Sequence, residues 1–206
     1  QRGVVFLSTP YDEAAVDLRS VYADARANWL WVRAYTAATA EPTMTAVAFV
    51  FLNIDANVTT GGPAEGMALW RAFEDDPTPG GYERAIGLRG DGTLIGVYAW
   101  DSTARAWIEQ PERPQQTRLS TGVSRDPLRL AGDDHAYFQV ELDLPAFELD
   151  DACDGTIFVR LWNDGTGARR FGDTSTLGPC KPRLNEFGDA EILKTASCED
   201  DDSCPA

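Results

Sequence analysis

The longest run of apolar residues, residues 46–52, limits the fold of this chain more than any other feature. The run is about as long as one β-strand and far shorter than the ~20 apolar residues of a membrane-spanning helix. It contains no polar position, so it predicts a strand that is buried on both faces. We therefore expect no membrane span and a core built around this strand.

Other segments alternate polar and apolar residues, which is typical of half-buried strands. Turns rich in Gly, Pro, Asp and Asn separate these segments. The pattern predicts an all-β fold: an antiparallel β-sandwich, jelly-roll-like, of about 8–10 short strands with little helix. Clear strands are predicted at residues 28–36, 93–100, 137–144 and 156–162, and weaker ones at residues 4–8, 18–23, 82–88, 104–109 and 117–123.

All four cysteines lie in the last third of the chain, and disulfides and a zinc site are the two alternatives for them. Zinc sites use closely spaced thiolate or imidazole pairs. The sequence has no C-x-x-C motif, and its single histidine, His135, is far from every cysteine. We therefore predict disulfides, of which the simplest pairing joins Cys153 to Cys180 and Cys198 to Cys204.

The sequence contains no Ser/Gly-rich or Pro-rich linker before its last residues. We predict a single β-sandwich domain over residues 1–197 and an acidic, disulfide-closed tail over residues 198–206. Disulfides persist in oxidising compartments, and a chain that starts at Gln1 without an initiating Met is expected to be a processed or excised product. These features predict a protein that is secreted, periplasmic or at the cell surface.

Acidic residues outnumber basic ones, 33 to 18, which gives a formal net charge of −15. A surface of this sign repels phosphate backbones and anionic lipids, so it disfavours binding to nucleic acid or to membrane surfaces. It suits divalent cations, basic partners or simple solubility.

The densest group of oxygen-bearing side chains directly follows residues 46–52. Asp55, Asn57 and Thr59 are spaced by two, and two glycines after them permit a tight turn. Calcium binds about six to eight oxygens from carboxylates, amides and carbonyls. The loop predicts a calcium site at Asp55, Asn57 and Thr59, and an ordinary Asx-type turn is the alternative.

Aromatic residues gather on one face of the strand predicted at residues 28–36. Trp29, Trp31 and Tyr35 share this face with Arg33. Aromatic rings stack on the apolar faces of sugars, so these three residues are the candidate ligand-binding platform. The alternative is packing, because tryptophan is more often a large, half-buried packing residue.

Signals for catalysis are few. A Ser-His-Asp triad would have to use His135, but no Gly-x-Ser-x-Gly elbow accompanies it. Glu141 and Asp143 share a strand face and suggest a glycoside hydrolase as a remote alternative, but the solvated edge of a strand is the favoured explanation of them. Phosphate loops and dinucleotide fingerprints are also missing. We therefore predict that the protein is not an enzyme.

Four segments carry a resemblance to a known family: residues 17–22 (DLRSVY), the aromatic strand at 29–35, residues 51–62 (FLNIDANVTTGG) and residues 81–86 (GYERAI). Together they resemble family 9 carbohydrate-binding modules and DOMON-like sandwiches of secreted bacterial proteins, over about residues 17–164. The resemblance implies a calcium-stabilised sandwich that binds glycans. The cysteine-bearing segment at the C-terminal end departs from that pattern.

Our leading hypothesis is therefore a non-catalytic exported binding module, stabilised by calcium, with a glycan as its partner. The alternative is a structural or accessory subunit of a periplasmic, surface-attached or filamentous assembly, with a protein as its partner. In that case an unpaired strand edge would pair with a neighbouring chain. The sequence specifies no oligomeric state.

Overall fold

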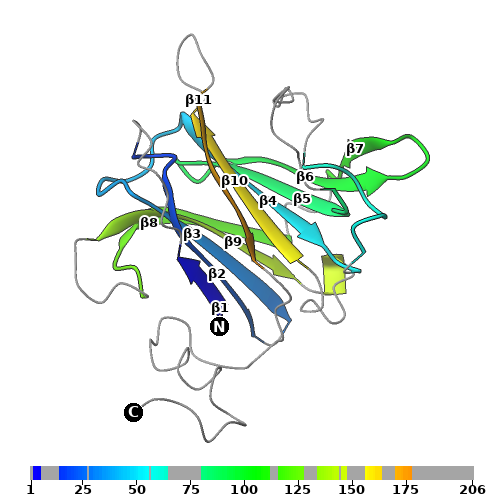
Figure 1. The fold of residues 1–206 in the computed structure, drawn as a ribbon, viewed down its shortest axis with the longest axis horizontal. Coiled ribbons are helices and arrows are strands. Elements are labelled where there is room, and N and C mark those ends of the chain that lie inside the picture. Colours follow the sequence, from blue (N-terminus) through cyan, green and yellow to red (C-terminus); the bar gives the residue numbers. More distant parts are fainter. Residues whose placement is uncertain are drawn as a thin grey trace, which may run out of the picture.

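The computed structural model describes residues 2–5, 14–26, 28–55, 57–64, 80–111, 116–127, 134–143, 145–147, 156–163 and 170–177. These residues form two antiparallel β-sheets packed face to face, with a single turn of 3-10 helix, η2 (Pro145–Phe147), after one of the strands (Figure 1). The predicted all-β, antiparallel β-sandwich is confirmed.

The first sheet has five strands, the two longest of which have 9 residues each. Neighbours along the sheet are antiparallel throughout. The order is β1 (Arg2–Val5), β2 (Leu18–Arg26), β3 (Trp29–Thr36), β9 (His135–Asp143) and β8 (Thr117–Ser124).

The second sheet has six strands and places the two-sided apolar strand near its middle. All of its neighbouring strands are also antiparallel. The order is β11 (Arg170–Leu177), β10 (Thr156–Asn163), β4 (Ala46–Asn53), β5 (Arg84–Arg89), β6 (Leu94–Asp101) and β7 (Ala106–Glu109).

Every predicted strand has a counterpart in one of the two sheets, but β11 was not predicted. Its sequence, RFGDTSTL, carries a glycine and a run of polar residues in place of alternation. Pairing with β10 along most of the length of β11 compensates for this weak local pattern.

The space between the sheets is filled by alternate residues of strands from both layers. Leu30, Val32 and Ala34 of β3 point into this core, as the alternation predicts. They pack with aliphatic residues of β4, β5 and β10 from the opposite sheet. On the other side of β3, Trp29 and Trp31 are half-buried.

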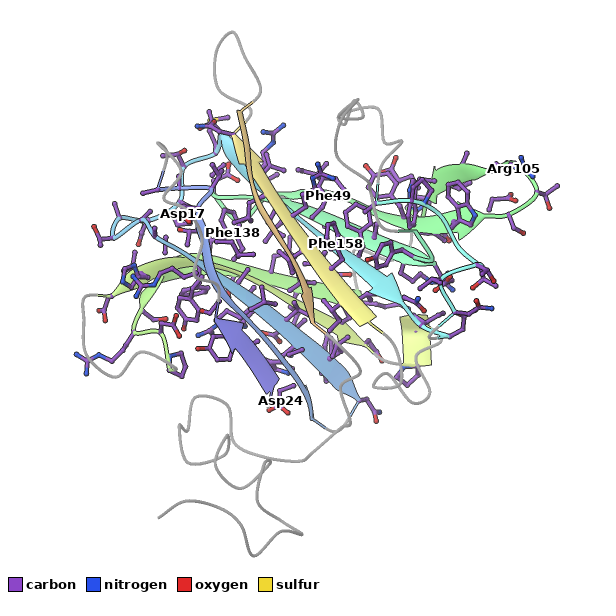
Figure 2. All side chains as sticks on the ribbon, viewed as in Figure 1. Asp17, Asp24, Phe49, Arg105, Phe138 and Phe158 are labelled. Atoms are coloured by element: carbon purple, nitrogen blue, oxygen red, sulfur yellow. The ribbon has the colours of Figure 1, made fainter. Side chains whose placement is uncertain are left out.

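A second apolar layer covers the outer face of the six-stranded sheet, because every residue of β4 is buried. Residues at alternate positions of β4 point away from the sandwich core and pack against rings from neighbouring strands, as predicted for a strand buried on both faces (Figure 2). This outer aromatic cluster comprises Val47, Phe49, Phe51, Ala64, Tyr82, Ala85 and Phe158, with Ile95, Tyr98 and Trp107 packed against it.

Several predictions fall on residues that the structure does not describe. The predicted tail at 198–206 lies wholly outside the described residues. In the described part of the chain, no helix is long and apolar enough to cross a membrane. All the cysteines, Cys153, Cys180, Cys198 and Cys204, also lie outside it, so their pairing stays a prediction.

Candidate functional site

The loop after β4 is held by hydrogen bonds from its own side chains. Asp55 Oδ1 accepts a hydrogen bond from the Asn57 N–H at 2.8 Å, and Asp55 Oδ2 accepts one from the Thr60 hydroxyl at 2.7 Å. Asn57 Oδ1 accepts bonds from the Thr59 N–H at 3.0 Å and the Thr59 hydroxyl at 2.7 Å. The predicted ligands Asp55, Asn57 and Thr59 therefore do come together, in the bonding pattern of consecutive Asx turns.

Glu83, just before β5, brings a second carboxylate to this loop. Its Oε2 accepts a hydrogen bond from the Ile54 N–H at 2.9 Å, while its buried Oε1 has no hydrogen-bond partner among the described residues. Burial raises the pKa of Glu83, and the nearby charge of Asp55 raises it further. Glu83 belongs to residues 81–86 (GYERAI), which carry the family resemblance, but the sequence alone does not mark Glu83 as a site residue.

The donor chemistry of this loop suits a hard cation, because Asp55, Asn57, Thr59 and Glu83 all present oxygens. Each carboxylate oxygen of Asp55 already accepts a bond from within the loop. Across the described residues, no group of three or more His, Cys, Asp or Glu side chains is placed to hold a metal ion. Calcium binding at Asp55 stays a prediction.

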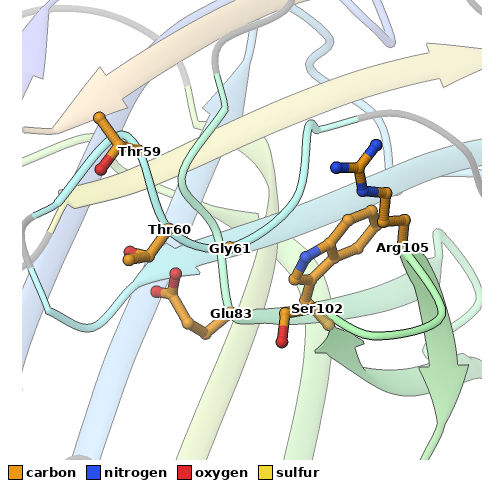
Figure 3. A pocket seen from close by; sticks show the side chains of 7 residues that line it. Thr59, Thr60, Gly61, Glu83, Ser102 and Arg105 are labelled. Carbon is orange, nitrogen blue, oxygen red and sulfur yellow. The ribbon is translucent and has the colours of Figure 1, made fainter.

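A hollow of about 530 Å³ opens between this loop and the turn that joins β6 to β7. Figure 3 shows Glu83 and Thr60 beside each other in its wall, with Arg105 at a separate position on the β6–β7 turn. The lining residues are Thr59, Thr60, Gly61, Glu83, Trp100, Ser102 and Arg105.

The indole of Trp100 is fixed in this wall from two sides. Trp107 meets it edge-on, with ring centroids 5.5 Å apart, and Trp107 Nε1 donates a hydrogen bond to the Pro63 carbonyl at 3.0 Å. The backbone of Gly62 packs directly against the Trp100 ring, where a β-carbon would overlap ring atoms. Gly62 is itself held by two backbone hydrogen bonds with Tyr82. Trp100 is therefore a positioned, half-buried ring.

Arg105 has an unusual backbone conformation at the rim of the hollow. Its φ is +49°, and it is the only non-glycine residue of the described chain with a positive φ. Asp101 Oδ1 shapes the turn by accepting hydrogen bonds from the Thr103 and Ala104 N–H groups at 2.8 and 2.9 Å. Because glycine adopts this conformation without strain, an arginine here suggests that its side chain has a use.

The predicted aromatic platform is only partly accessible. Tyr35 is 1% exposed, and its ring packs against those of Tyr22 and Tyr137, with centroids 5.8 and 5.9 Å away. Trp29 and Trp31 remain half-exposed on the same face, and the guanidinium of Arg118 lies 4.0 Å above the Trp29 ring. A ligand-binding role for this face stays a prediction, with Tyr35 in a packing position.

The residues considered for catalysis lie away from the hollow. His135 is buried, and its Nε2 lies 2.6 Å from an Arg19 guanidinium nitrogen. Glu141 and Asp143 share the outer face of β9, as predicted. Glu141 accepts a hydrogen bond from Gln139 at 2.8 Å and lies 3.9 Å from Arg118. His135 and Glu141 therefore each contact neighbouring polar side chains.

No family model matches this sequence, and no curated protein is significantly similar to it. The resemblance to family 9 carbohydrate-binding modules and DOMON-like sandwiches stays a prediction. The assignment of a site therefore rests on the geometry of the hollow.

Replacing Glu83 with glutamine should raise the melting temperature at pH 7, and this gain should disappear on acidification. A raised pKa means that folding disfavours the ionised carboxyl, so stability from this group increases as the pH falls through its folded-state pKa toward the ordinary glutamate pKa of 4.5. Thermal melts of both proteins between pH 7 and about pH 4 measure the difference.

Glu41→Gln is the matched control, because Glu41 is exposed. It should change the melting temperature little at either pH. A Glu83→Gln protein that is less stable than wild type at pH 7 would show that the bond from Ile54 outweighs the cost of burial.

Proposed function

We propose that this protein is a non-catalytic, exported binding module and that the hollow beside Trp100 is its glycan-binding site. One combination carries the proposal: a positioned, half-buried indole, that of Trp100, and a carboxylate, that of Glu83, line the same hollow. A sugar suits both groups, because its C–H face packs on an aromatic ring and its hydroxyls donate hydrogen bonds to a carboxylate.

The remaining lining residues suit the same ligand. Thr59, Thr60 and Ser102 add hydroxyls that both donate and accept hydrogen bonds. The volume of about 530 Å³ lies within the ~300–1,000 Å³ of typical small-ligand sites. Placement at the surface, between two turns, leaves room for a longer chain to extend outward.

Binding fits this lining better than hydrolysis does. Glycoside hydrolases place two carboxyl groups on either side of the scissile bond, about 5–10 Å apart. The hollow has one carboxylate in its lining, that of Glu83. The four cysteines, read as disulfides, support the exported part of the proposal.

Trp100→Ala tests the site. Binding to an oligosaccharide found on a glycan array should weaken by about tenfold or more, measured by calorimetry, because aromatic anchors dominate small contact areas. Trp29→Ala removes a half-exposed tryptophan from the other sheet and should leave the affinity unchanged.

Each outcome of that experiment is informative. Loss of binding in Trp29→Ala alone would move the site to the five-stranded sheet, and silence on the whole array would reject glycan binding. Titrations and thermal melts in Ca²⁺ and in EDTA test the calcium proposal at Asp55, Asn57 and Thr59. If neither the affinity nor the melting temperature differs between the two conditions, the calcium proposal is contradicted.

One observation favours the alternative of a structural subunit. Strand β8 is an edge of the five-stranded sheet with 8 residues in unbroken register with β9 and no proline. Such an edge is a template for pairing with another chain. The opposite edge strand of this sheet, β1, pairs with β2 on its inner side. A discrete multimer on size exclusion, together with an array without binding, would favour this function.

A further inference from the structure

We propose that the hollow selects glycans that carry a carboxylate group, such as those containing uronic acids, and that Arg105 is the residue that recognises this carboxylate. The inference rests on the proposed glycan-binding function and names the substrate class of the same site. The starting observation is that Arg105 is the one cationic side chain among the described residues that line the hollow.

Arg105 is exposed and makes no ion pair or hydrogen bond with any described residue. Two acids of the same region already accept hydrogen bonds: Asp101 Oδ1 accepts two from its own turn, and Glu83 Oε2 accepts one from the Ile54 N–H. The guanidinium is thus left with its donors available. A planar guanidinium matches a carboxylate with two parallel hydrogen bonds, a geometry that neutral hydroxyls do not reproduce.

The backbone conformation of Arg105 gives a second, independent reason. A residue with a β-carbon costs free energy at positive φ, and glycine would remove that cost. Figure 2 places Arg105 at the tip of the β6–β7 hairpin, where no packing requirement asks for a long side chain. Arg105 lines the hollow from this strained position, and recognition of a ligand would give its side chain a use.

The charges of the site also orient such a ligand. Glu83 repels a ligand carboxylate but accepts hydrogen bonds from sugar hydroxyls, whereas Arg105 attracts the carboxylate. The two groups lie at different places around the opening (Figure 3). A sugar that carries both hydroxyls and one carboxylate therefore has a single favoured orientation, with its ring beside Trp100. The chain as a whole has a net charge of −15, which repels anions. Arg105 is the lining residue that attracts an anionic ligand.

The experiment compares each acidic oligosaccharide with its own methyl ester, which keeps the sugar and removes the charge. Calorimetry on the wild-type chain with galacturonic, glucuronic and mannuronic oligosaccharides should show at least one acid that binds about tenfold more tightly than its ester. Raising the salt concentration should reduce that preference.

Arg105→Gln should remove the preference, so that each acid and its ester bind with similar affinity. Arg105→Gly, which suits the positive φ, should do the same with a higher melting temperature than wild type, so loss of folding cannot explain the result. Arg118→Gln removes an exposed positive charge from the other sheet and should keep the preference.

The outcomes separate the inference from the function on which it rests. Esters and acids that bind equally to wild type, or a preference that survives in Arg105→Gln, would overturn the inference and leave glycan binding standing. Binding of neutral glycans without binding of acidic ones would also overturn the inference and leave glycan binding standing. Absence of binding to every acid, ester and neutral glycan would overturn both.

Discussion

Replacing Phe51 with alanine should lower the free energy of unfolding by about 3–5 kcal/mol, the usual cost of removing a fully buried phenylalanine. Phe51 is 0% exposed and lies at the centre of the outer aromatic cluster. Its ring centroid lies 5.7 Å from that of Tyr82, 5.8 Å from that of Trp107 and 6.1 Å from that of Phe158. Alanine would leave a cavity that three rigid rings cannot fill without moving.

The effect should reach the hollow, because Trp107 contacts both Phe51 and Trp100. Denaturation in urea with linear extrapolation measures the loss of stability, and calorimetry measures the loss of ligand affinity. Phe51→Leu keeps more of the apolar bulk and should cost less than Phe51→Ala.

Ile108→Ala is the control, because it removes apolar atoms from an exposed position outside the buried part of the cluster. Ile108 lies on β7 and is 44% exposed, so its truncation should change stability by less than about 0.5 kcal/mol. A Phe51→Ala protein that loses no more than Ile108→Ala would contradict a structural role for the outer cluster.

The double burial of β4 could be predicted because it depends on one short segment. Residues 46–52 contain no polar side chain, and a strand of this kind has to bury both faces wherever it lies in a sheet. The faces of β3 were predictable for a similar reason, since side chains alternate along any strand. Local pattern was sufficient for both.

The burial of Tyr35 could not be predicted from the same alternation. The pattern assigns Tyr35 to the face of Trp29 and Trp31, and the structure agrees. What covers each position depends on the neighbouring strands: Tyr35 pairs with Ser20 of β2 and with Tyr137 of β9, and its hydroxyl lies 2.9 Å from that of Ser124 on β8. Such neighbours are set by the order of strands, which local pattern leaves open.

The candidate site shows the same division. Asp55, Asn57 and Thr59 are close in sequence, so their meeting in one loop was predictable. Glu83 and Trp100 join them only because β5 pairs with β4, and β6 pairs with β5, in one antiparallel sheet. The sequence carried each of these residues without a spacing that links them.

Gly62→Ala should remove ligand binding at the hollow and lower stability by about 1–3 kcal/mol, a range typical of forced overpacking. A β-carbon at Gly62 would overlap the ring of Trp100, so the indole has to leave its position. The backbone cannot give way easily, because Gly62 and Tyr82 exchange hydrogen bonds of 2.7 and 3.0 Å. The φ of Gly62 is not positive, so the change introduces a clash and no backbone strain.

Gly80→Ala is the matched control, because a β-carbon at Gly80 meets no atom within 4 Å. It should leave both binding and stability near their wild-type values. The double variant Gly62→Ala/Trp100→Ala should be less destabilised than the sum of the single changes, because removing the ring also removes the clash. Wild-type affinity in Gly62→Ala would show that the ligand does not use Trp100, and additive stability losses would show that the indole and Gly62 do not constrain each other.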